Sequence, residues 1–480
     1  MVFNPYLPEG EYVPDGEPHV FDGRVYVFGS HDRWGGGDFC LNDYVCWSAP
    51  ENDLSAWRCE GVIYRRTQDP LCTAPDMRLF APDVQRGPDG RYYLYYAFDF
   101  SGVISVAAAA RPAGPYAFYA HVHYADGTPL GKRPGDPFVY DPAVLAAAGG
   151  RVFLYTGFCP TGAISPRFAA MHLSIQGCTV TELEPDMCTV RQAPRVLLPW
   201  AQTAAGTDFA AHPFFEAPSI RACGGRYYLV YSSIHNHELC WAVSARPDGG
   251  FRFGGVLVSN GDIGIGGRTQ PLNYTGTNHG GLARIAGRWY VFYHRQTGGT
   301  PYARQGCAEE LTQRPDGAFV QAEMTSCGLN GGPLPGTGTY PAYIACCLQS
   351  AAGAVPYRPK TRVDGSHPYI AQQGADGDPA ARQYIANLRS GACAGFRWFA
   401  PAVPTAVSAC LRADGSGELA VSQTQDGPAC VSISVRPGGE HCAAGTGRLP
   451  AGRQALWFTY RGTGSVDLFS FSLTPETEEL

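Results

Sequence analysis

Five segments of the chain combine a turn glycine with a nearly continuous run of apolar residues. The runs are GRVYVFGS from Gly23, GRYYLYYA from Gly90, GRVFLYTG from Gly150, GRYYLVYS from Gly225 and GRWYVFYH from Gly287. This pattern is typical of a strand that is covered on both faces, in contrast to the alternation of a half-exposed strand. Successive glycines lie 60 to 75 residues apart, which predicts a repeated structural unit.

Each repeat is long enough for a small antiparallel sheet. Further strand-like phrases follow the main run in several repeats, at residues 54–64, 113–122 and 249–258. A unit of this length fits four short strands with their loops, and single units of this kind cannot bury both faces alone. The sequence therefore predicts an all-β protein with a five-bladed β-propeller over residues 1–325. A long β-sandwich is the alternative, but it gives no reason for five matched phrases.

The repeat ends at a stretch rich in Gly and Pro. We expect residues 326–345 to be a linker or a closing segment. Beyond it, strand-like runs recur at residues 429–436, 455–462 and 465–473, bounded by Gly, Asp and Pro. This spacing predicts that residues 346–480 form a separate β-sandwich.

Composition and charge exclude several classes of protein. Charged residues make up 16% of the chain, and the net charge of −6 is spread without a Lys/Arg run, which argues against a nucleic-acid partner. No apolar stretch reaches the roughly 18–20 residues that cross a bilayer, so no membrane partner is expected. No secretory signal is visible, and the 17 cysteines include no Cys-x-x-Cys pair. These features predict reduced thiols in a cytoplasmic protein and leave the oligomeric state open.

An ionisable residue precedes each repeat glycine by seven to nine positions. One Asp before a strand is usually a turn residue, but five ionisable residues in one register need a common explanation. Equivalent positions of successive blades surround a propeller axis, so these side chains should converge there. Their neighbours are apolar or Pro-rich, and carboxylates in such surroundings tend to be functional. The five residues are Asp15, Asp83, Asp141, Glu216 and His279.

Several carboxylates around one axis suggest glycoside hydrolysis. This reaction uses one carboxylic acid to protonate the leaving oxygen and one carboxylate on the opposite face of the sugar. Crowding of like charges raises the pKa of at least one of them. Aromatic residues near the same loops are candidates to stack on sugar rings, although each alone is more often core packing. They are Trp34, Phe39, Phe80 and Phe215.

The motifs NPYLPEGEYVPDGEPHVFDGRVYVFGSHD, FAPDV, YDPAVL and EAPSI occur in this order and make residues 1–325 resemble glycoside hydrolase family 43. The resemblance implies a five-bladed propeller and hydrolysis that inverts the anomeric centre. It makes Asp15 the general base, Glu216 the general acid, and Asp141 the residue that orients the acid and tunes its pKa. The family more often has Asp-Pro at the base, whereas Gly16 follows Asp15 here, so Glu17 is a rival base.

The resemblance also implies a set of substrate-binding residues: Asp83 as a wall of the pocket, Phe80, Phe215, His279 and Arg304. Phe80 stands where the family usually has Trp. His279 matches a histidine that in relatives holds a water or a metal ion, often calcium. The resemblance thus implies no required cofactor, with Ca²⁺ as the candidate ion at the propeller centre and His279 as its ligand.

The C-terminal part is similar in outline to a carbohydrate-binding module of family 6, and this resemblance implies a jelly-roll-like β-sandwich. The acidic pair with which such modules bind structural calcium is not evident near residues 342–350. A second polar cluster, His235-Asn236-His237-Glu238, lacks the spacing of a His-Glu-x-x-His zinc motif. We interpret it as part of a turn or pocket rim.

We therefore expect an inverting exo-glycosidase that removes terminal α-L-arabinofuranosyl residues from plant-derived oligosaccharides, as in xylan degradation. Its base and acid carboxyls should lie roughly 6.5–9.5 Å apart. A β-D-xylosidase and a galactofuranosidase are alternatives on the same scaffold, since pocket loops set sugar identity. From other classes, a sugar-binding propeller without catalysis and a structural scaffold stay open.

Overall fold

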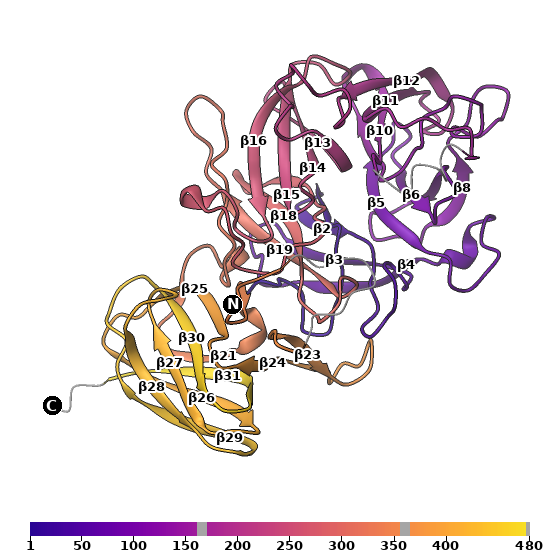
Figure 1. Cartoon of the computed structure of the whole chain (residues 1–480). Helices are drawn as coiled ribbons and strands as arrows, with labels where there is room; N and C mark the ends of the chain where they lie inside the picture. The colour runs from indigo at the N-terminus through magenta and orange to yellow at the C-terminus, as the bar shows by residue number, and fades with distance from the viewer. Residues whose placement is uncertain (161–169, 356–364, 477–480) are drawn as a thin grey trace.

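A computed structural model of the protein describes residues 1–160, 170–355 and 365–476. Within these ranges the chain is built mainly from β-strands, arranged as five small sheets and one larger curled sheet (Figure 1). The prediction of an all-β protein with a five-bladed propeller and a C-terminal β-domain is confirmed. No helix within the same ranges is long and apolar enough to cross a membrane.

The first two blades are antiparallel sheets whose four strands follow one another in sequence order. Blade I contains β1 (Glu17–Phe21), β2 (Arg24–Phe28), β3 (Tyr44–Pro50) and β4 (Arg58–Tyr64). The 3₁₀ turn η1 (Arg66–Gln68) leads to blade II, which contains β5 (Leu79–Arg86), β6 (Tyr92–Phe98), β7 (Ile104–Ala109) and β8 (Ala117–His121).

The remaining three blades follow the same plan. Blade III contains β9 (Ala143–Ala146), η2 (Ala148–Gly150), β10 (Val152–Thr156), β11 (Cys178–Leu183) and β12 (Val190–Leu198). Blade IV contains β13 (Phe214–Cys223), β14 (Arg226–Ser233), β15 (Glu238–Ser244) and β16 (Arg252–Ser259), and η4 (Ile265–Gly267) follows it. Blade V has three strands, β17 (Leu282–Ile285), β18 (Arg288–Gln296) and β19 (Arg304–Leu311).

The first strands of the five blades form a closed inner ring. β1 contacts β5 and β17, β9 contacts β5 and β13, and β13 contacts β17. N-terminal residues complete the fifth blade, because the Tyr6 amide donates to the Gly306 carbonyl of β19 and the Asn4 amide donates to the Ser326 carbonyl. The start of the chain thereby closes the propeller.

The repeated apolar phrase forms the second strand of every blade. All residues of β6 and β10 are buried, because these strands lie inside a sheet that is packed between other blades. The turn before each of these strands requires a positive φ, which glycine adopts without steric cost. The turn glycines have φ between 73° and 84°: Gly23, Gly90, Gly150, Gly225 and Gly287.

The C-terminal domain is a curled sheet whose two halves enclose a core. β29 pairs with β28 in one half and with β26 in the other, so it joins them. Phe396 and Phe471 come from opposite halves, and their ring centroids lie 4.8 Å apart. The strands are β20 (Leu334–Pro335), β21 (Gly338–Pro341), β22 (Cys347–Gln349), β23 (Tyr369–Gln373), β24 (Arg382–Arg389), β25 (Cys393–Ala400), β26 (Thr405–Ala413), β27 (Gly417–Ser422), β28 (Ala429–Val435), β29 (Gly438–Gly447), β30 (Gln454–Gly462) and β31 (Ser465–Pro475).

Much of the stretch expected to be a linker takes part in this sheet. β20 pairs with β25 and β21 pairs with β31. The short turns η5 (Gly328–Asn330) and η6 (Ala342–Ile344) flank them. The Gly/Pro content of residues 326–345 therefore reflects tight turns between short strands.

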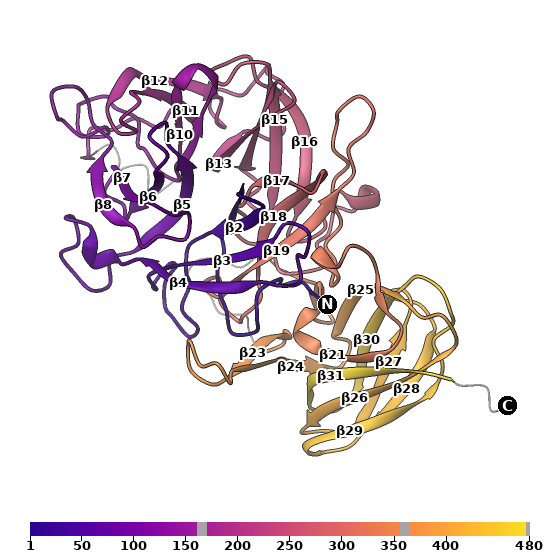
Figure 2. The same ribbon diagram turned by 180° about the vertical axis from the view of Figure 1, so that it is seen from behind.

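The two domains share a packed interface (Figure 2). Trp457 and Cys347 of the C-terminal domain belong to the same apolar cluster as Met324 at the end of the propeller. Arg397 of β25 is buried and pairs with Asp262 of the propeller. Apolar packing and a buried ion pair therefore hold the C-terminal domain against blade V.

One pair of cysteines departs from the expectation of reduced thiols. Cys410 on β26 and Cys442 on β29 are direct cross-strand partners and form a disulfide. Adjacent antiparallel strands bring such side chains close enough to bond, which the scattered cysteine positions did not reveal. The other fifteen cysteines are free thiols, and most of them are buried.

Candidate active site

The five residues in repeat register lie on or just before the innermost strands. Asp15, Asp141 and His279 precede β1, β9 and β17, whereas Asp83 and Glu216 lie within β5 and β13. Glu216 is half-buried and the other four are buried. Asp15 interacts electrostatically with Asp141, Glu216 and His279. These four residues, with Arg304, form the candidate active site.

Asp15 is held as an ionised carboxylate. Its Oδ1 accepts a hydrogen bond from Arg304 Nη1 at 2.8 Å and lies 3.1 Å from His294 Nδ1. Burial alone would raise the pKa of Asp15, but the charge of Arg304 and the contact with His294 outweigh burial. Together they hold the pKa of Asp15 well below its usual range. This carboxylate therefore has the charge that a general base needs at neutral pH.

Asp32 fixes the guanidinium that holds Asp15. Asp32 Oδ2 accepts from Arg304 Nε at 2.9 Å, and Asp32 Oδ1 accepts from Arg304 Nη2 at 3.0 Å. Arg304 Nη2 also contacts Cys40 Sγ at 3.4 Å. These bonds and the bond to Asp15 use four of the five guanidinium N–H groups. One Nη1–H is left for a substrate hydroxyl, so Arg304 stays a predicted substrate ligand.

Glu216 and Asp141 are carboxyl groups with raised pKa values. Burial and then the charge of Asp15 raise the pKa of Glu216 to about 8, with Arg304 opposing the rise. Burial, Glu216 and Asp15 raise the pKa of Asp141 well above its ordinary value, and a backbone hydrogen bond from Ala217 opposes this. Two such neighbours do not both ionise at neutral pH. Because the Ala217 N–H favours the ionised form of Asp141, we assign the proton to Glu216.

The site thus combines an ionised and a protonated carboxyl group. Asp15 can accept a proton from water, and Glu216 can donate one to a leaving oxygen. Environments that push the pKa values of two carboxyls apart are typical of acid–base pairs. The arrangement is suited to hydrolysis of a glycosidic bond.

Asp83 connects neighbouring blades and does not line the pocket, contrary to the sequence-based prediction. It is fully buried, and its Oδ2 accepts from the Val144 amide of blade III at 2.8 Å. Its Oδ1 accepts from the Val84 amide and lies 2.6 Å from His19 Nε2 of blade I. Its carboxylate therefore ties blades I, II and III together and has no surface for a substrate.

Glu17, the rival base, is also engaged elsewhere. Its Oε2 accepts from Arg221 Nη2 at 2.7 Å and from Ser219 Oγ at 2.9 Å, and only 1% of the residue is exposed. Neither donor belongs to the group around Asp15. The contact with Arg304 distinguishes Asp15 from Glu17, and it favours Asp15 as the base.

His279 lies beside Asp141, with Nδ1 3.9 Å from Asp141 Oδ2. Burial lowers the pKa of His279 to about 4, despite the opposing charge of Asp15, so the imidazole is neutral. Ca²⁺ is bound by six to eight oxygen ligands. Here the carboxylates that act on His279 are Asp141, Asp15, which already pairs with Arg304, and Asp83, which is bonded between the blades. These side chains supply too few free oxygen atoms to fit a resident Ca²⁺ ion.

The predicted aromatic residues fall into two groups. Phe80 is buried against Tyr140 and Phe100, with ring centroids 5.3 Å apart in each pair. Phe215 is half-buried and contacts Phe158. Phe39 is half-buried, and the guanidinium of Arg304 lies 4.8 Å from the centre of its ring. Phe39 and Phe215 thus keep exposed edges close to site residues, whereas Phe80 is mainly core.

Sequence reasoning missed His294 and Asp32. The eighth residue of the repeated phrase is Ser30, Ala97, Gly157 or Ser232 in four blades and His294 in the fifth. A histidine in a position otherwise held by small residues was a usable signal. Asp32 follows the first phrase by two positions, as Asp99 follows the second, but the other three repeats have Cys159, Ile234 and Gln296 there. The position therefore gave only a weak pattern.

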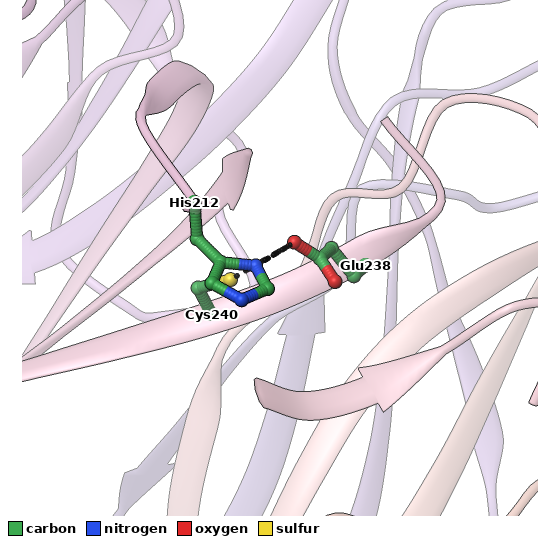
Figure 3. A group of neighbouring side chains, drawn as sticks. All are labelled: His212, Glu238 and Cys240. Atoms are coloured by element: carbon green, nitrogen blue, oxygen red, sulfur yellow. Dashed lines mark hydrogen bonds and ion pairs between the residues drawn. The ribbon is translucent and has the colours of Figure 1, made fainter. Parts of the chain in front are cut away.

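The turn expected at residues 235–238 contacts the loop before β13 through the side chains of Glu238 and His212 (Figure 3). Glu238 Oε1 accepts from Ser233 Oγ and lies 2.6 Å from His212 Nδ1, with Cys240 Sγ 3.5 Å away. The imidazole and the carboxylate satisfy each other, so this group needs no metal ion. It fixes His212, four residues before Glu216, to the third strand of the same blade.

Comparison with known proteins agrees with this chemistry. The model of glycosyl hydrolases family 43 matches residues 11–319. A protein of Thermoclostridium stercorarium named xylosidase/arabinosidase is 49% identical over 479 residues, which is 98% of each chain.

Two solved structures are similar as well. CoXyl43 from a compost microbial metagenome, a β-xylosidase/α-arabinofuranosidase of family 43 solved with xylotriose in a calcium-free form, is 25% identical. Its TM-score is 0.51 over 65% of this chain and 94% of that one. A family 43 arabinoxylan arabinofuranohydrolase of Bacillus subtilis, solved with cellotetraose, shares the fold of both domains with a TM-score of 0.50 and 19% identity over 98% of this chain and 97% of that one. The chain belongs to glycosyl hydrolases family 43 and is a glycoside hydrolase.

Proposed function

We propose that the protein is an inverting exo-glycosidase that releases terminal α-L-arabinofuranosyl residues from plant-derived oligosaccharides. The observation that carries this proposal is the contrast between Asp15 and Glu216. Arg304 keeps Asp15 ionised, whereas burial and the charge of Asp15 raise the pKa of Glu216 to about 8 and so keep it protonated at neutral pH. One site therefore holds a base and an acid at the same pH.

In the proposed reaction, Asp15 removes a proton from a water molecule that attacks the anomeric carbon. Glu216 donates its proton to the glycosidic oxygen as the bond to the leaving group breaks. The negative charges of Glu216 and Asp141 disfavour each other, so an ionised Asp141 helps Glu216 to keep its proton. The attack occurs from the face opposite the leaving group, so the anomeric configuration is inverted.

The choice of sugar rests on the relatives. The Thermoclostridium stercorarium protein is named for both xylose and arabinose, and the Bacillus subtilis enzyme for arabinofuranose on arabinoxylan. A β-D-xylosidase is the second candidate, because CoXyl43 has both activities in its description and was solved with xylotriose. In either case the partner is a short oligosaccharide.

Hydrolysis of matched nitrophenyl α-L-arabinofuranoside and β-D-xyloside tests the sugar. We expect a higher kcat/KM for the arabinofuranoside, with loss of turnover in Glu216→Ala. A higher kcat/KM for the xyloside would keep the mechanism and replace the sugar. Turnover by Glu216→Gln equal to that of the native protein would overturn the assignment of the acid.

Proton NMR of the first product tests the stereochemistry. We expect the β-anomer of arabinose to appear first from the α-arabinofuranoside, followed by slow mutarotation. Initial appearance of the α-anomer would show retention and overturn the role of Asp15 as a base that activates water.

We also propose a cytoplasmic site of action. The fifteen free cysteines support it, since a reducing compartment preserves thiols, whereas the Cys410–Cys442 disulfide argues for an oxidising one. Fractionation of the native host, followed by immunodetection, decides between them: detection in the soluble cytoplasmic fraction is expected, and detection in the medium or envelope would reject it.

A further inference from the structure

A hairpin of the C-terminal domain reaches the loop that carries Asp32. β23 and β24 form this hairpin, and Asp376 lies in its turn. Asp376 Oδ1 accepts from the Trp34 amide at 2.7 Å, and Asp376 Oδ2 accepts from Asn42 Nδ2 at 2.9 Å. Trp34 and Asn42 both belong to the β2–β3 loop, residues 29–43, and Asn42 stands near its end. One carboxylate thus bridges two separate points of this loop.

Asn42 connects Asp376 with Asp32. Its Nδ2 donates both to Asp376 and to the Asp32 carbonyl, the latter at 3.0 Å. The Cys40 amide of the same loop donates to Asp32 Oδ1 at 2.9 Å. Asp32 in turn holds Arg304, and Arg304 holds Asp15. A continuous set of hydrogen bonds therefore leads from Asp376 to the proposed base.

The same hairpin contacts the second segment that positions Arg304. The Ile370 amide donates to the Thr297 carbonyl at 2.9 Å, in the loop between β18 and β19. Gln383 Nε2 donates to Tyr12 OH at 2.7 Å and to Gln305 Oε1 at 3.4 Å. Gln305 directly follows Arg304 in β19. Both sides of the Asp32–Arg304 pair are thus supported by the C-terminal domain.

We propose that Asp376 is a positioning residue for catalysis, which fixes the Asp32–Arg304–Asp15 array from the C-terminal domain. The proposal rests on Asp15 being the base. It assigns the domain a part in the active site that propeller-sized relatives lack, since CoXyl43 matches 65% of this chain with 94% of its own. Attachment of the domain does not depend on Asp376, because Arg397, Asp262 and the apolar cluster hold it at blade V.

Loss of Asp376 should act on catalysis through the charge of Asp15. Without it the β2–β3 loop and Asp32 move more freely, the contact between Arg304 and Asp15 weakens, and the pKa of Asp15 rises. The charged and titratable groups that face Asp15 are Arg304 from β19, His294 from β18, His279 before β17, Glu216 from β13 and Asp141 before β9, together with the Cys40 thiol of the β2–β3 loop and the Tyr44 phenol of β3. None of these is removed by the substitution, so a change in pH dependence reports their arrangement.

The test compares Asp376→Ala with Glu440→Ala as a matched control. Glu440 is an exposed carboxylate of β29 that pairs with Arg382 of the same hairpin. We expect Asp376→Ala to lower kcat/KM about tenfold or more, to move the acidic limb of its pH profile upward, and to speed hydrogen exchange at the Trp34 and Cys40 amides. The control should match the native protein in all three. An Asp376→Ala protein with native kinetics, pH profile and exchange would overturn the proposal.

A second variant guards against misfolding. Asn42→Ala breaks the same bridge from the propeller side, and it should give the same upward move of the acidic limb. Combining it with Asp376→Ala should add little, because both changes break one connection. Additive effects would overturn the proposal. Asp15→Asn is measured in parallel: turnover by that variant would show that the assignment of the base has failed, and the exchange rates would still report on the bridge.

Discussion

Arg304 and Asp15 lie 289 residues apart in the chain and share a buried hydrogen bond of 2.8 Å. Asp32 holds the opposite edge of the same guanidinium in a two-bonded contact. The planar fork of arginine makes this double engagement possible. The charge of the base is therefore set by a residue that is itself fixed in orientation.

Replacing Arg304 with Lys tests whether geometry or charge alone holds Asp15. A lysine keeps the charge but cannot bond Asp15 and Asp32 at once. We expect kcat/KM to fall by about 100-fold, with the acidic limb of the pH profile at higher pH. A Lys variant with the native acidic limb would show that the charge alone is enough.

The pH profile of kcat/KM should be bell-shaped. Hydrolysis needs Asp15 ionised and Glu216 protonated, so activity falls at low pH as Asp15 gains a proton. It falls again near pH 8 as Glu216 loses its proton, in line with the raised pKa of that group. Initial rates at low substrate concentration up to pH 10 measure the basic limb. The lowered pKa of Asp15 places the acidic limb below the usual range of a carboxyl group, so native activity should stay constant down to about pH 4.

Asp141→Asn should shift the basic limb of that profile. Because we assign the negative charge of this pair to Asp141, its removal should favour ionisation of Glu216, lower the pKa of Glu216 and move the basic limb to lower pH. The acidic limb should move little, because Arg304 and His294 remain in contact with Asp15. A basic limb at unchanged or higher pH would show that Asp141 does not influence the acid through its charge.

The propeller and most of the acid–base group could be predicted because blades repeat. Asp15 and Glu216 occupy equivalent positions of different blades, so one register located both. The predicted role of Asp83 illustrates the limit of this argument. It shares the register, yet its carboxylate points between blades and accepts backbone amides of β5 and β9.

The long-range contacts that position the active-site residues could not be predicted from patterns in the sequence. Asp32 lies in a loop without a repeated phrase, and its partner Arg304 is 272 residues away. Asp376 belongs to a different domain. The disulfide between Cys410 and Cys442 depends on the pairing register of β26 and β29, which the alternation of residues in either strand does not specify.

His212→Gln should lower the stability of the native protein in a pH-dependent way. The hydrogen bond to Glu238 raises the pKa of His212. Burial of Glu238 would raise the pKa of its carboxyl group, but the contacts with His212 and Ser233 outweigh burial and lower this pKa to about 2. Because the pKa of His212 is raised by folding, His212 stabilises the fold fully at pH values below its pKa in the unfolded chain. This contribution is lost as the pH rises through the pKa of His212 in the folded protein. Because the pKa of Glu238 is lowered by folding, Glu238 stabilises the fold fully at pH values above its pKa in the unfolded chain. This contribution is lost as the pH falls toward 2.

The pair therefore contributes most between these two ranges, at about pH 5–6. There we expect the Tm of His212→Gln to be lower than native by roughly 2 °C, with a smaller difference at pH 9. Calorimetry at both values measures it. A difference that is equal at pH 5.5 and pH 9 would mean that the imidazole contributes packing against Phe253 rather than charge.

Removal of divalent ions tests the proposal that turnover requires no metal. His279 offers one nitrogen, and the nearby Asp15 is already paired with Arg304. Among the described residues, His279 belongs to neither group of side chains close enough to hold a metal ion together. We expect kcat/KM and Tm to be unchanged after dialysis against EDTA, and added Ca²⁺ to restore nothing. His279→Ala should lower kcat/KM equally with and without EDTA, because its neutral imidazole acts as a polar contact. A loss of activity with EDTA that Ca²⁺ reverses in the native protein, but not in His279→Ala, would instead place an ion beside this histidine.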